Sequence, residues 1–387
     1  MTSHHLYVHV PFCRLLCAYC DFVTVGGRTD DIPGYVDKLL VELALRPAPG
    51  RLRTISFGGG TPSLLSPDQV RRVIAGARER WSDATLDEVT LEANPSRREV
   101  PDWSGLRAAG VTRISLGAQS LRDADLVALA RGHDATEVQE AVAAVREVGF
   151  ESLSLDLMYG IPGQSLDDWH EGLAAAVELG PDHVSCYALQ LVLAPDEWAA
   201  RPRPGALRWR RRMAERQDDG LAADQYRLAE ELLAGAGYGH YELSSWARAG
   251  HESRHNAAYW ARRPYTGIGA GAHSYDGATR SWNVRDLDRY LDAIHRGERP
   301  IEGSEALDEP TRAFEAIALG LRRVNGLARA GFAREFGADP AEHFADAVAE
   351  GRGRGLLELT GKELRLTPLG RLLASEACLP FLPGTPA

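Results

Sequence analysis

The stretch "TISFGGGTPSLLSPDQVRRVIAGARERW", residues 54–81, combines a β-rich run, a glycine-rich loop and a long helix-like segment. Ser66 stands where a helix N-cap is expected, directly before the helix-like part. The stretch therefore predicts one β-α unit, with its glycines at the point where the strand ends.

The same alternation extends outward in both directions along the chain. Further β-rich runs are "LYVHV" (6–10), "EVTLEAN" (88–94), "TRISLGAQS" (112–120), "SLSLDLMYG" (152–160) and "HVSCYALQ" (183–190), and helix-like segments cover 31–45, 135–149 and 165–180. Strands that alternate with helices predict parallel β-α units. Six strands are too few for an eightfold barrel, so we expect an α/β fold with a partial (β/α)6 barrel. Cysteines, glycines and carboxylates follow the strand ends, which places a site at the C-terminal rim.

We expect three parts in the chain. Residues 1–195 form the partial barrel and its site, 196–300 form an extension, and 301–387 form a mainly helical domain that a hairpin makes winged-helix-like. The arginines at 208, 210, 211 and 212 are interpreted as a solvated face, with pairing to the carboxylate groups of a bound ligand as the alternative. The last part lacks the clustered basic face of a DNA-groove reader.

Composition narrows the functional class. The 387 residues are 44% hydrophobic and carry a formal charge of −10, which argues against a general nucleic-acid binder. Five cysteines, three of them clustered, do not form a secreted disulfide framework and favour the cytoplasm. No run approaches the roughly 18 apolar residues of a membrane span.

The clustered cysteines follow the first strand, in "YVHVPFCRLLCAYCDF", residues 7–22. Cys13, Cys17 and Cys20 have the spacing C-x3-C-x2-C, and thiolates this close bind zinc or an iron–sulfur cluster. Three ligands leave one iron of a [4Fe–4S] cube open. The alternative is structural zinc with His9 or Asp21 as its fourth ligand.

The cysteine motif, with Tyr19 before its last cysteine, resembles the radical S-adenosylmethionine (SAM) superfamily. There the open iron chelates the amino and carboxylate groups of SAM, which is cleaved to methionine and a deoxyadenosyl radical. "FGGGTPSLL", "EANP", "RISLGAQS", "LARGH", "DLMYGIPGQ", "HNAAYW" and "GIGAGAHS" occur in the order seen in oxygen-independent coproporphyrinogen III oxidases and their relatives. By position, the resemblance implies a SAM site made by Tyr7, Tyr19, Gly59, Gly60, Thr61, Glu92, Gln119, Arg131 and Asp156.

Within that family, the dehydrogenases carry a further cysteine where this chain has Phe22. "CDF" instead resembles the HemW-type haem chaperones, and "HNAAYW" (255–260) matches their haem-associated motif. The resemblance implies that His255 contacts haem, and an imidazole beside aromatic rings suits that ligand. A buried histidine satisfied by hydrogen bonds is the structural alternative.

The resemblance thus implies a cytoplasmic haem chaperone that binds a [4Fe–4S] cluster, SAM and haem and delivers haem to haemoproteins, notably respiratory ones. A reductase would supply electrons. An oxygen-independent coproporphyrinogen III oxidase of porphyrin biosynthesis is the alternative, and a radical methyltransferase is a third possibility. The sequence leaves open whether SAM is turned over and whether the protein is an enzyme.

Overall fold

A computed structural model describes residues 2–99, 101–191 and 205–384 of the chain. Its centre is a curved sheet in the order β14-β13-β12-β11-β1-β4-β5-β6-β7-β8-β10-β9. Six neighbouring strands are parallel and correspond to the six runs expected from the sequence: β1 (Ser3–Val10), β4 (Arg51–Gly59), β5 (Glu88–Ala93), β6 (Arg113–Gln119), β7 (Ser152–Tyr159) and β8 (His183–Ala188). The expected partial (β/α)6 barrel is confirmed, because the sheet keeps two open ends.

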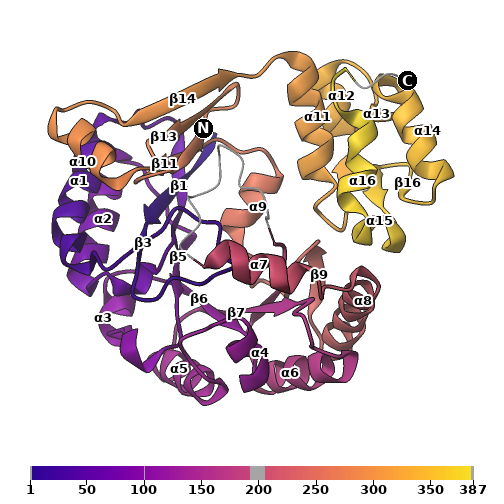
Figure 1. Ribbon diagram of the computed structural model, residues 1–387. Coiled ribbons are helices and arrows are strands. Elements are labelled where there is room, and N and C mark those ends of the chain that lie inside the picture. Colours follow the sequence, from indigo (N-terminus) through magenta and orange to yellow (C-terminus); the bar gives the residue numbers. More distant parts are fainter. Residues whose placement is uncertain (1, 100, 192–204, 385–387) are drawn as a thin grey trace.

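Helices cover the convex side of this sheet, and Figure 1 shows them as an outer arc around the strands. They are α1 (Ile32–Leu45), α2 (Pro67–Arg80), α3 (Trp103–Ala108), α4 (Asp123–Ala128), α5 (Ala135–Val148), α6 (Leu166–Glu178) and, after β8, α8 (Asp219–Gly235). Ser66 begins α2 with a capping box: its side chain accepts from the Gln69 N–H, and the Gln69 side chain accepts from the Ser66 N–H. The buried apolar side chains of these strands and helices pack into one core.

Short strands extend the sheet beyond the six units. β11 (Tyr265–Ile268) runs parallel beside β1, and β12 (His273–Tyr275), β13 (Thr279–Asn283) and β14 (Ile301–Ala306) follow it antiparallel. At the other end lie β10 (Ser245–Ala247) and β9 (Gly239–Glu242). Besides α8, the described residues between β8 and β14 include the helices α7 (Ala206–Ala214), α9 (Arg254–Trp260) and α10 (Leu287–His295).

The C-terminal region is mainly helical, as expected, and has a core of its own. Its helices are α11 (Glu309–Gly320), α12 (Arg329–Phe336), α13 (Pro340–His343), α14 (Ala345–Gly353), α15 (Pro368–Leu372) and α16 (Ala374–Cys378). The antiparallel strands β16 (Leu357–Leu359) and β17 (Glu363–Leu366) form the expected hairpin, which β15 (Leu327–Ala328) joins. Figure 1 shows this region beside the barrel.

The division into residues 1–195, 196–300 and 301–387 stays a prediction. Its first boundary falls within 192–204, outside the described residues, as does most of the proline- and arginine-rich stretch before α7. Its second boundary precedes β14, which still pairs with β13 of the large sheet. Among the described residues, no helix is both long enough and apolar enough to cross a membrane.

Candidate functional site

The loop that carries the three cysteines is closed at its base by two short strands. β2 (Phe12–Cys13) pairs parallel with β3 (Val25–Gly26), and the Val25 N–H donates to the Pro11 carbonyl at 2.8 Å. His9, near the end of β1, adds a 2.7 Å bond from Nε2 to the Val23 carbonyl. The segment with Cys17 and Cys20 is therefore held at the C-terminal rim of the barrel.

This loop forms one wall of a cavity of about 480 Å³. The sequence named thirteen candidate residues, and the cavity lining contains eleven of them: Cys13, Cys17, Tyr19, Cys20, Gly59, Gly60, Thr61, Glu92, Gln119, Arg131 and Asp156. They come from the cysteine loop and from the ends of four parallel strands or the loops that follow them. The chain fold thus brings distant motifs into one enclosure, whereas their individual roles remain predictions.

All three thiols of the motif line the same cavity, and thiolates at this spacing bind soft metal centres. Among the described residues, no three His, Cys, Asp or Glu side chains converge as a site for one metal ion. In a [4Fe–4S] cube each thiolate binds a different iron, so its ligands stay apart. The two candidates for a fourth zinc ligand are also engaged elsewhere: His9 bonds Tyr7 and Val23, and Asp21 forms an ion pair with Arg210 at 2.6 Å.

The glycine turn after β4 offers backbone, not side chains, to the cavity. Gly59 has a φ of 112°, which only glycine adopts readily. A Cβ on Gly60 would lie 2.7 Å from the Phe12 carbonyl oxygen, next to Cys13. The turn therefore packs directly against the strand that carries Cys13, and its glycines line the cavity without side chains.

Two carboxylates, Glu92 and Asp156, form the floor of the cavity. Burial and the charge of Asp156 raise the pKa of Glu92 to about 7, although the Gly59 N–H, which donates to it at 3.2 Å, acts in the opposite direction. Burial also raises the pKa of Asp156, against hydrogen bonds that include Ser115 at 2.9 Å. A buried acidic pair of this kind attracts cationic or hydroxyl groups.

Arg131 provides the positive counterpart. Its guanidinium donates to the Cys17 thiol at 3.2 Å and to the Asn94 side chain at 2.7 Å. Its buried Nε has no hydrogen-bond partner among residues 2–99, 101–191 and 205–384. An orphaned N–H in a cavity wall marks a place for an acceptor that the chain does not supply. Together with the acidic floor and the glycine turn, it fits a ligand that carries both an amino and a carboxylate group.

Sequence reasoning missed Asn94, which links several of these groups. Its amide donates to the Thr61 hydroxyl at 3.0 Å, and that hydroxyl donates to the Cys13 sulfur at 3.6 Å. The sequence did carry a signal for this residue, because Asn94 belongs to the motif "EANP" together with Glu92, at the same strand end.

The two remaining candidates lie elsewhere. Tyr7 stands behind the glycine turn and bonds His9 at 3.1 Å. His255 lies on α9 near the opposite ends of the strands, beside His5 and Thr54. It is 2% exposed, and both ring nitrogens are engaged: Nδ1 with Thr54 at 2.7 Å and Nε2 with Tyr259 at 2.8 Å. The structure does not bring it to the cysteine cavity.

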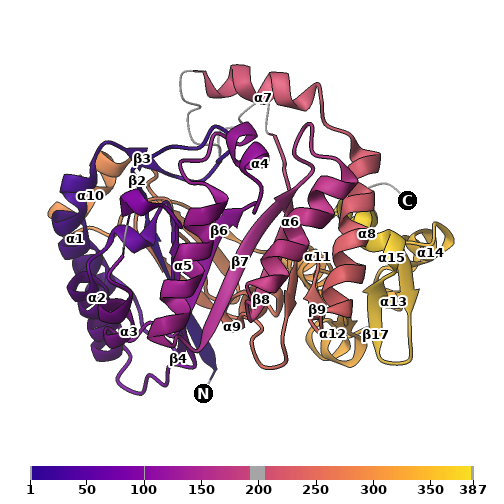
Figure 2. The same cartoon turned by 90° about the horizontal axis from the view of Figure 1, so that it is seen from below.

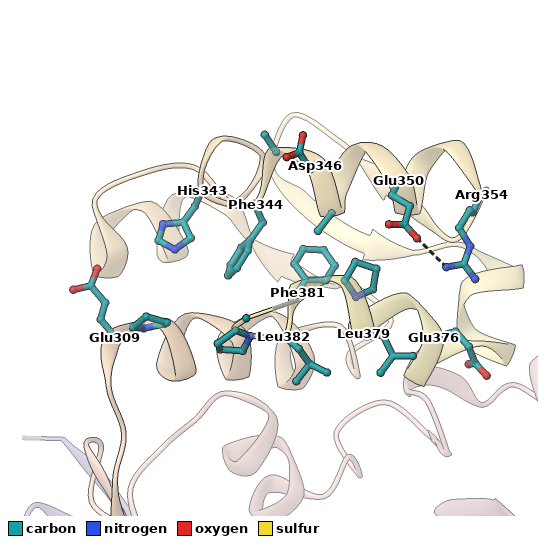
Figure 3. Close-up of a pocket in the computed structure, with 16 residues that line it drawn as sticks. Glu309, His343, Phe344, Asp346, Glu350, Arg354, Glu376, Leu379, Phe381 and Leu382 are labelled. Atoms are coloured by element: carbon teal, nitrogen blue, oxygen red, sulfur yellow. Dashed lines mark hydrogen bonds and ion pairs between the residues drawn. The ribbon is translucent and has the colours of Figure 1, made fainter. Parts of the chain in front are cut away.

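A larger cavity, of about 940 Å³, lies in the C-terminal region and is shown in Figure 3. Its floor includes Phe344 and Phe381, and its rim carries Glu309, Asp346 and Glu376. It has neither a thiol nor a strand-end carboxylate. The smaller cysteine cavity is therefore the candidate site.

The chain is similar to known proteins over most of its length. The model of the radical SAM superfamily matches residues 7–175, and the model of the HemN C-terminal domain matches residues 307–373. "Heme chaperone HemW" of Mycobacterium tuberculosis is 37% identical and covers 95% of this chain and 92% of its own length. The protein of that name from Bacillus subtilis is 32% identical over 97% and 98%, respectively.

A solved structure shares the whole architecture. Coproporphyrinogen III oxidase (HemN) from Escherichia coli, a radical SAM enzyme, matches with a TM-score of 0.83 over 99% of this chain and 91% of that one. The sequence identity is 23%, so this likeness supports the fold alone.

Proposed function

The chain belongs to the HemW family of the radical SAM superfamily, and from this membership we propose that it binds a [4Fe–4S] cluster, SAM and haem and delivers haem to haem-requiring proteins. The observation that carries the proposal is the single cavity shared by three thiols, a glycine turn, an acidic floor and an incompletely bonded arginine. The clustered cysteine spacing of the sequence, which is not that of a secreted disulfide framework, supports a reducing compartment, the cytoplasm.

In this proposal, each wall of the cavity has its own task. Cys13, Cys17 and Cys20 hold three irons, and the cluster, when bound with SAM, supplies reductive cleavage of the sulfonium. Arg131 binds the SAM carboxylate through its free N–H, and Glu92 with Asp156 holds the amino group or ribose hydroxyls. The turn residues Gly59, Gly60 and Thr61 line the methionine end, while Tyr19 and Gln119 complete the enclosure.

Haem binding rests on the family and on the printed names of the relatives. His255 remains the proposed ligand, with a condition that the structure adds. Burial and the nearby His5 lower the pKa of His255 to about 3, so its imidazole is neutral, the form that binds iron. Nδ1 is hydrogen-bonded to Thr54, so Nε2 is the nitrogen that would bind iron. It must first lose its hydrogen bond to Tyr259.

The first experiment tests whether the protein holds an iron–sulfur cluster. Wild-type protein and a Cys13→Ser variant are reconstituted anaerobically, and iron and sulfide are measured per chain. We expect about four of each for the wild type and a clear loss in the variant. Equal, low contents in both proteins would contradict the cluster.

The same reconstituted protein, reduced and given SAM and coproporphyrinogen III, distinguishes chaperone from oxidase. Mass spectrometry should find the porphyrinogen intact, while a positive-control oxidase removes two carboxyl groups. Decarboxylation by this chain would instead establish the oxidase and would show that Phe22 does not distinguish the two groups.

A second experiment tests the haem ligand. We expect His255→Ala to lose the histidine-ligated absorption spectrum of added haem, and Tyr259→Phe, which frees Nε2, to bind haem at least as tightly as the wild type. His170→Ala, at an exposed position on α6, serves as the control. An unchanged spectrum in His255→Ala would remove that residue from the proposal.

A further inference from the structure

Asn94 joins two hydrogen-bond chains that each end at a sulfur of the cysteine motif. On one side, its amide nitrogen donates to the Thr61 hydroxyl at 3.0 Å, and that hydroxyl donates to the Cys13 sulfur at 3.6 Å. On the other side, its amide oxygen accepts from Arg131 at 2.7 Å, and the same guanidinium donates to the Cys17 sulfur at 3.2 Å. One side chain therefore stands behind two of the three thiols of the motif.

The groups in these two chains come from separate β-α units. Cys13 lies on β2, Asn94 directly follows β5, and Arg131 comes three residues after the end of α4. Figure 2 shows β2 and α4 at the same end of the barrel, away from the start of β1. The contacts of Asn94 therefore depend on how the barrel packs and not on a local motif.

A buried carboxylate helps to fix the direction in which the Asn94 amide points. Glu99, which is 7% exposed, accepts from the amide nitrogen at 3.2 Å. In the reversed orientation, the amide N–H groups would face the Arg131 guanidinium, which can only donate, and the amide oxygen would face the Glu99 carboxylate. The amide is therefore held with its nitrogen toward Thr61 and its oxygen toward Arg131.

This orientation also sets the direction of the Thr61 hydroxyl. A hydroxyl has a single proton to donate, and here a lone pair of its oxygen accepts from Asn94. The proton is then directed to the Cys13 sulfur, and because Thr61 is 1% exposed, water has little access to compete for it. Each bond in such a chain polarises the next, so Asn94 strengthens the bond that Thr61 makes to sulfur.

The loop around the third cysteine is held through its backbone. Arg210 on α7 is buried and donates to the Ala18 carbonyl at 2.9 Å and to the Cys20 carbonyl at 3.1 Å. The sequence interpretation as part of a solvated face is therefore wrong for Arg210. These two contacts position the loop, whereas the bonds that Asn94 directs reach sulfur atoms.

We propose that Asn94 is a positioning residue that raises the reduction potential of the bound cluster, because it directs hydrogen bonds to the thiolates of Cys13 and Cys17. The inference rests on the proposed function, since it requires the cluster. One-electron reduction converts [4Fe–4S]2+ to [4Fe–4S]+ and adds negative charge to the cluster and its sulfur ligands. A donor directed at a sulfur stabilises that added charge, and hydrogen bonds to the sulfurs are among the factors that set such potentials.

The test measures the midpoint potential of the reconstituted cluster without SAM, so that weaker SAM binding in a variant does not affect the result. The wild type, Asn94→Ala, Thr61→Val and the double variant are titrated anaerobically with dithionite and redox mediators. Electron paramagnetic resonance quantifies the reduced cluster, and iron and sulfide are measured in every sample. Thr61→Ser keeps the hydroxyl, and Gln139→Ala, which removes an exposed amide from α5, is the control.

We expect Asn94→Ala to make reduction about tenfold less favourable, which corresponds to a midpoint potential about 59 mV more negative for one electron. Thr61→Val should shift the potential in the same direction by a smaller amount, because the chain through Arg131 remains. Thr61→Ser and Gln139→Ala should match the wild type. The double variant should shift by less than the sum of the single changes, because both remove the same bond to Cys13.

A wild-type potential in Asn94→Ala at full iron content would overturn the inference. If Asn94→Ala does not fold or does not hold iron, the two Thr61 variants decide, and equal potentials in Thr61→Val and Thr61→Ser would overturn it. A wild-type protein that forms no cluster would instead overturn the proposed function on which the inference depends.

Discussion

Glu92 shows how one residue couples ligand binding to stability. Its pKa is about 7 in the folded chain, against an ordinary 4.5, so between these values the folded state holds a proton that the unfolded state has lost. Stability therefore falls as pH rises through this window, by at most about 3 kcal/mol. In the proposed function, the ionised form of Glu92 is nevertheless the one that would attract the cationic groups of SAM.

Glu92→Gln separates the two effects, because an amide oxygen can still accept from the Gly59 N–H. We expect the variant to be about 1 to 3 kcal/mol more stable than the wild type at pH 8 and equal to it near pH 4.5. SAM binding should weaken about tenfold or more. Urea unfolding at both pH values and calorimetric titration of SAM check this, with Glu147→Gln on α5 as the exposed control. A stability gain of Glu92→Gln over the wild type that is larger at pH 4.5 than at pH 8 would contradict the assignment.

At the scale of single residues, the sequence predicts those whose chemistry follows from a local motif. The cysteine spacing predicted three of the residues that line the cavity, and the resemblance to the radical SAM family implied the other eight. Arg210 could not be found this way, because its contacts to Ala18 and Cys20 join segments about 190 positions apart. The placement of His255 away from the cavity is likewise set by tertiary packing and not by its motif.

At the scale of elements, the turn after β4 and strand β2 act as one unit. The Gly60 and Thr61 N–H groups donate to the Val10 and Phe12 carbonyls, each at 2.8 Å. A Cβ on Gly60 would meet this backbone, which cannot rotate away as a side chain could. The position of Cys13 therefore depends on a glycine in another β-α unit.

We expect Gly60→Ala to move β2 away from the turn and to lower cluster occupancy and SAM affinity severalfold, with the barrel still folded. Iron content, SAM titration and far-ultraviolet circular dichroism measure the three effects. Gly34→Ala on α1, where a Cβ meets nothing within 4 Å, is the matched control. Wild-type iron content and SAM affinity in Gly60→Ala would show that the turn and the cysteine strand adjust independently.

Elements with a strong pattern were predictable, and short ones were not. The six parallel strands and the long helices α1, α2, α5 and α6 follow the expected ranges within a few residues. The six-residue helices α3 and α4 carry too few turns to show a helical period, and tertiary contacts stabilise them. The strands β9 to β14 were likewise outside the predicted pattern, because pairing with a pre-existing sheet edge defines such short strands.

Over the whole molecule, the two ends of the barrel have opposite chemistry. The C-terminal rim carries the thiols and acids of the cavity, whereas the other end holds buried histidines. His4 bonds Thr266 at 2.9 Å, His5 bonds Thr54 at 2.8 Å, and His255 shares the same Thr54 hydroxyl. The His5 Nε2 atom is buried and has no hydrogen-bond partner in the described part of the chain. These side chains join β1, β4, β11 and α9 as neutral imidazoles.

Their titration predicts the acid stability of the protein. Burial lowers the pKa of His4 and His5 to about 4, in His4 with help from the neighbouring His5 charge, and lowers that of His255 to about 3. Below pH 6.5 these histidines bind protons in the unfolded chain but stay neutral in the folded chain. The free energy of unfolding therefore falls between about pH 6.5 and pH 4. Each group contributes up to about 3 kcal/mol, which exceeds the opposite effect of Glu92 when the three are taken together.

Because folded proteins have only about 5 to 15 kcal/mol in reserve, we expect a large loss of stability between pH 7.5 and pH 5. Urea unfolding across that range measures it. His4→Gln should lower stability at pH 7.5, since it loses the stacking on Trp81, yet it should flatten the dependence on pH. His170→Gln, exposed on α6, should leave both unchanged. An unfolding free energy that stays constant from pH 7.5 to pH 5 would mean that these imidazoles already carry protons in the folded chain, and that the barrel end opposite the cysteines is open to water.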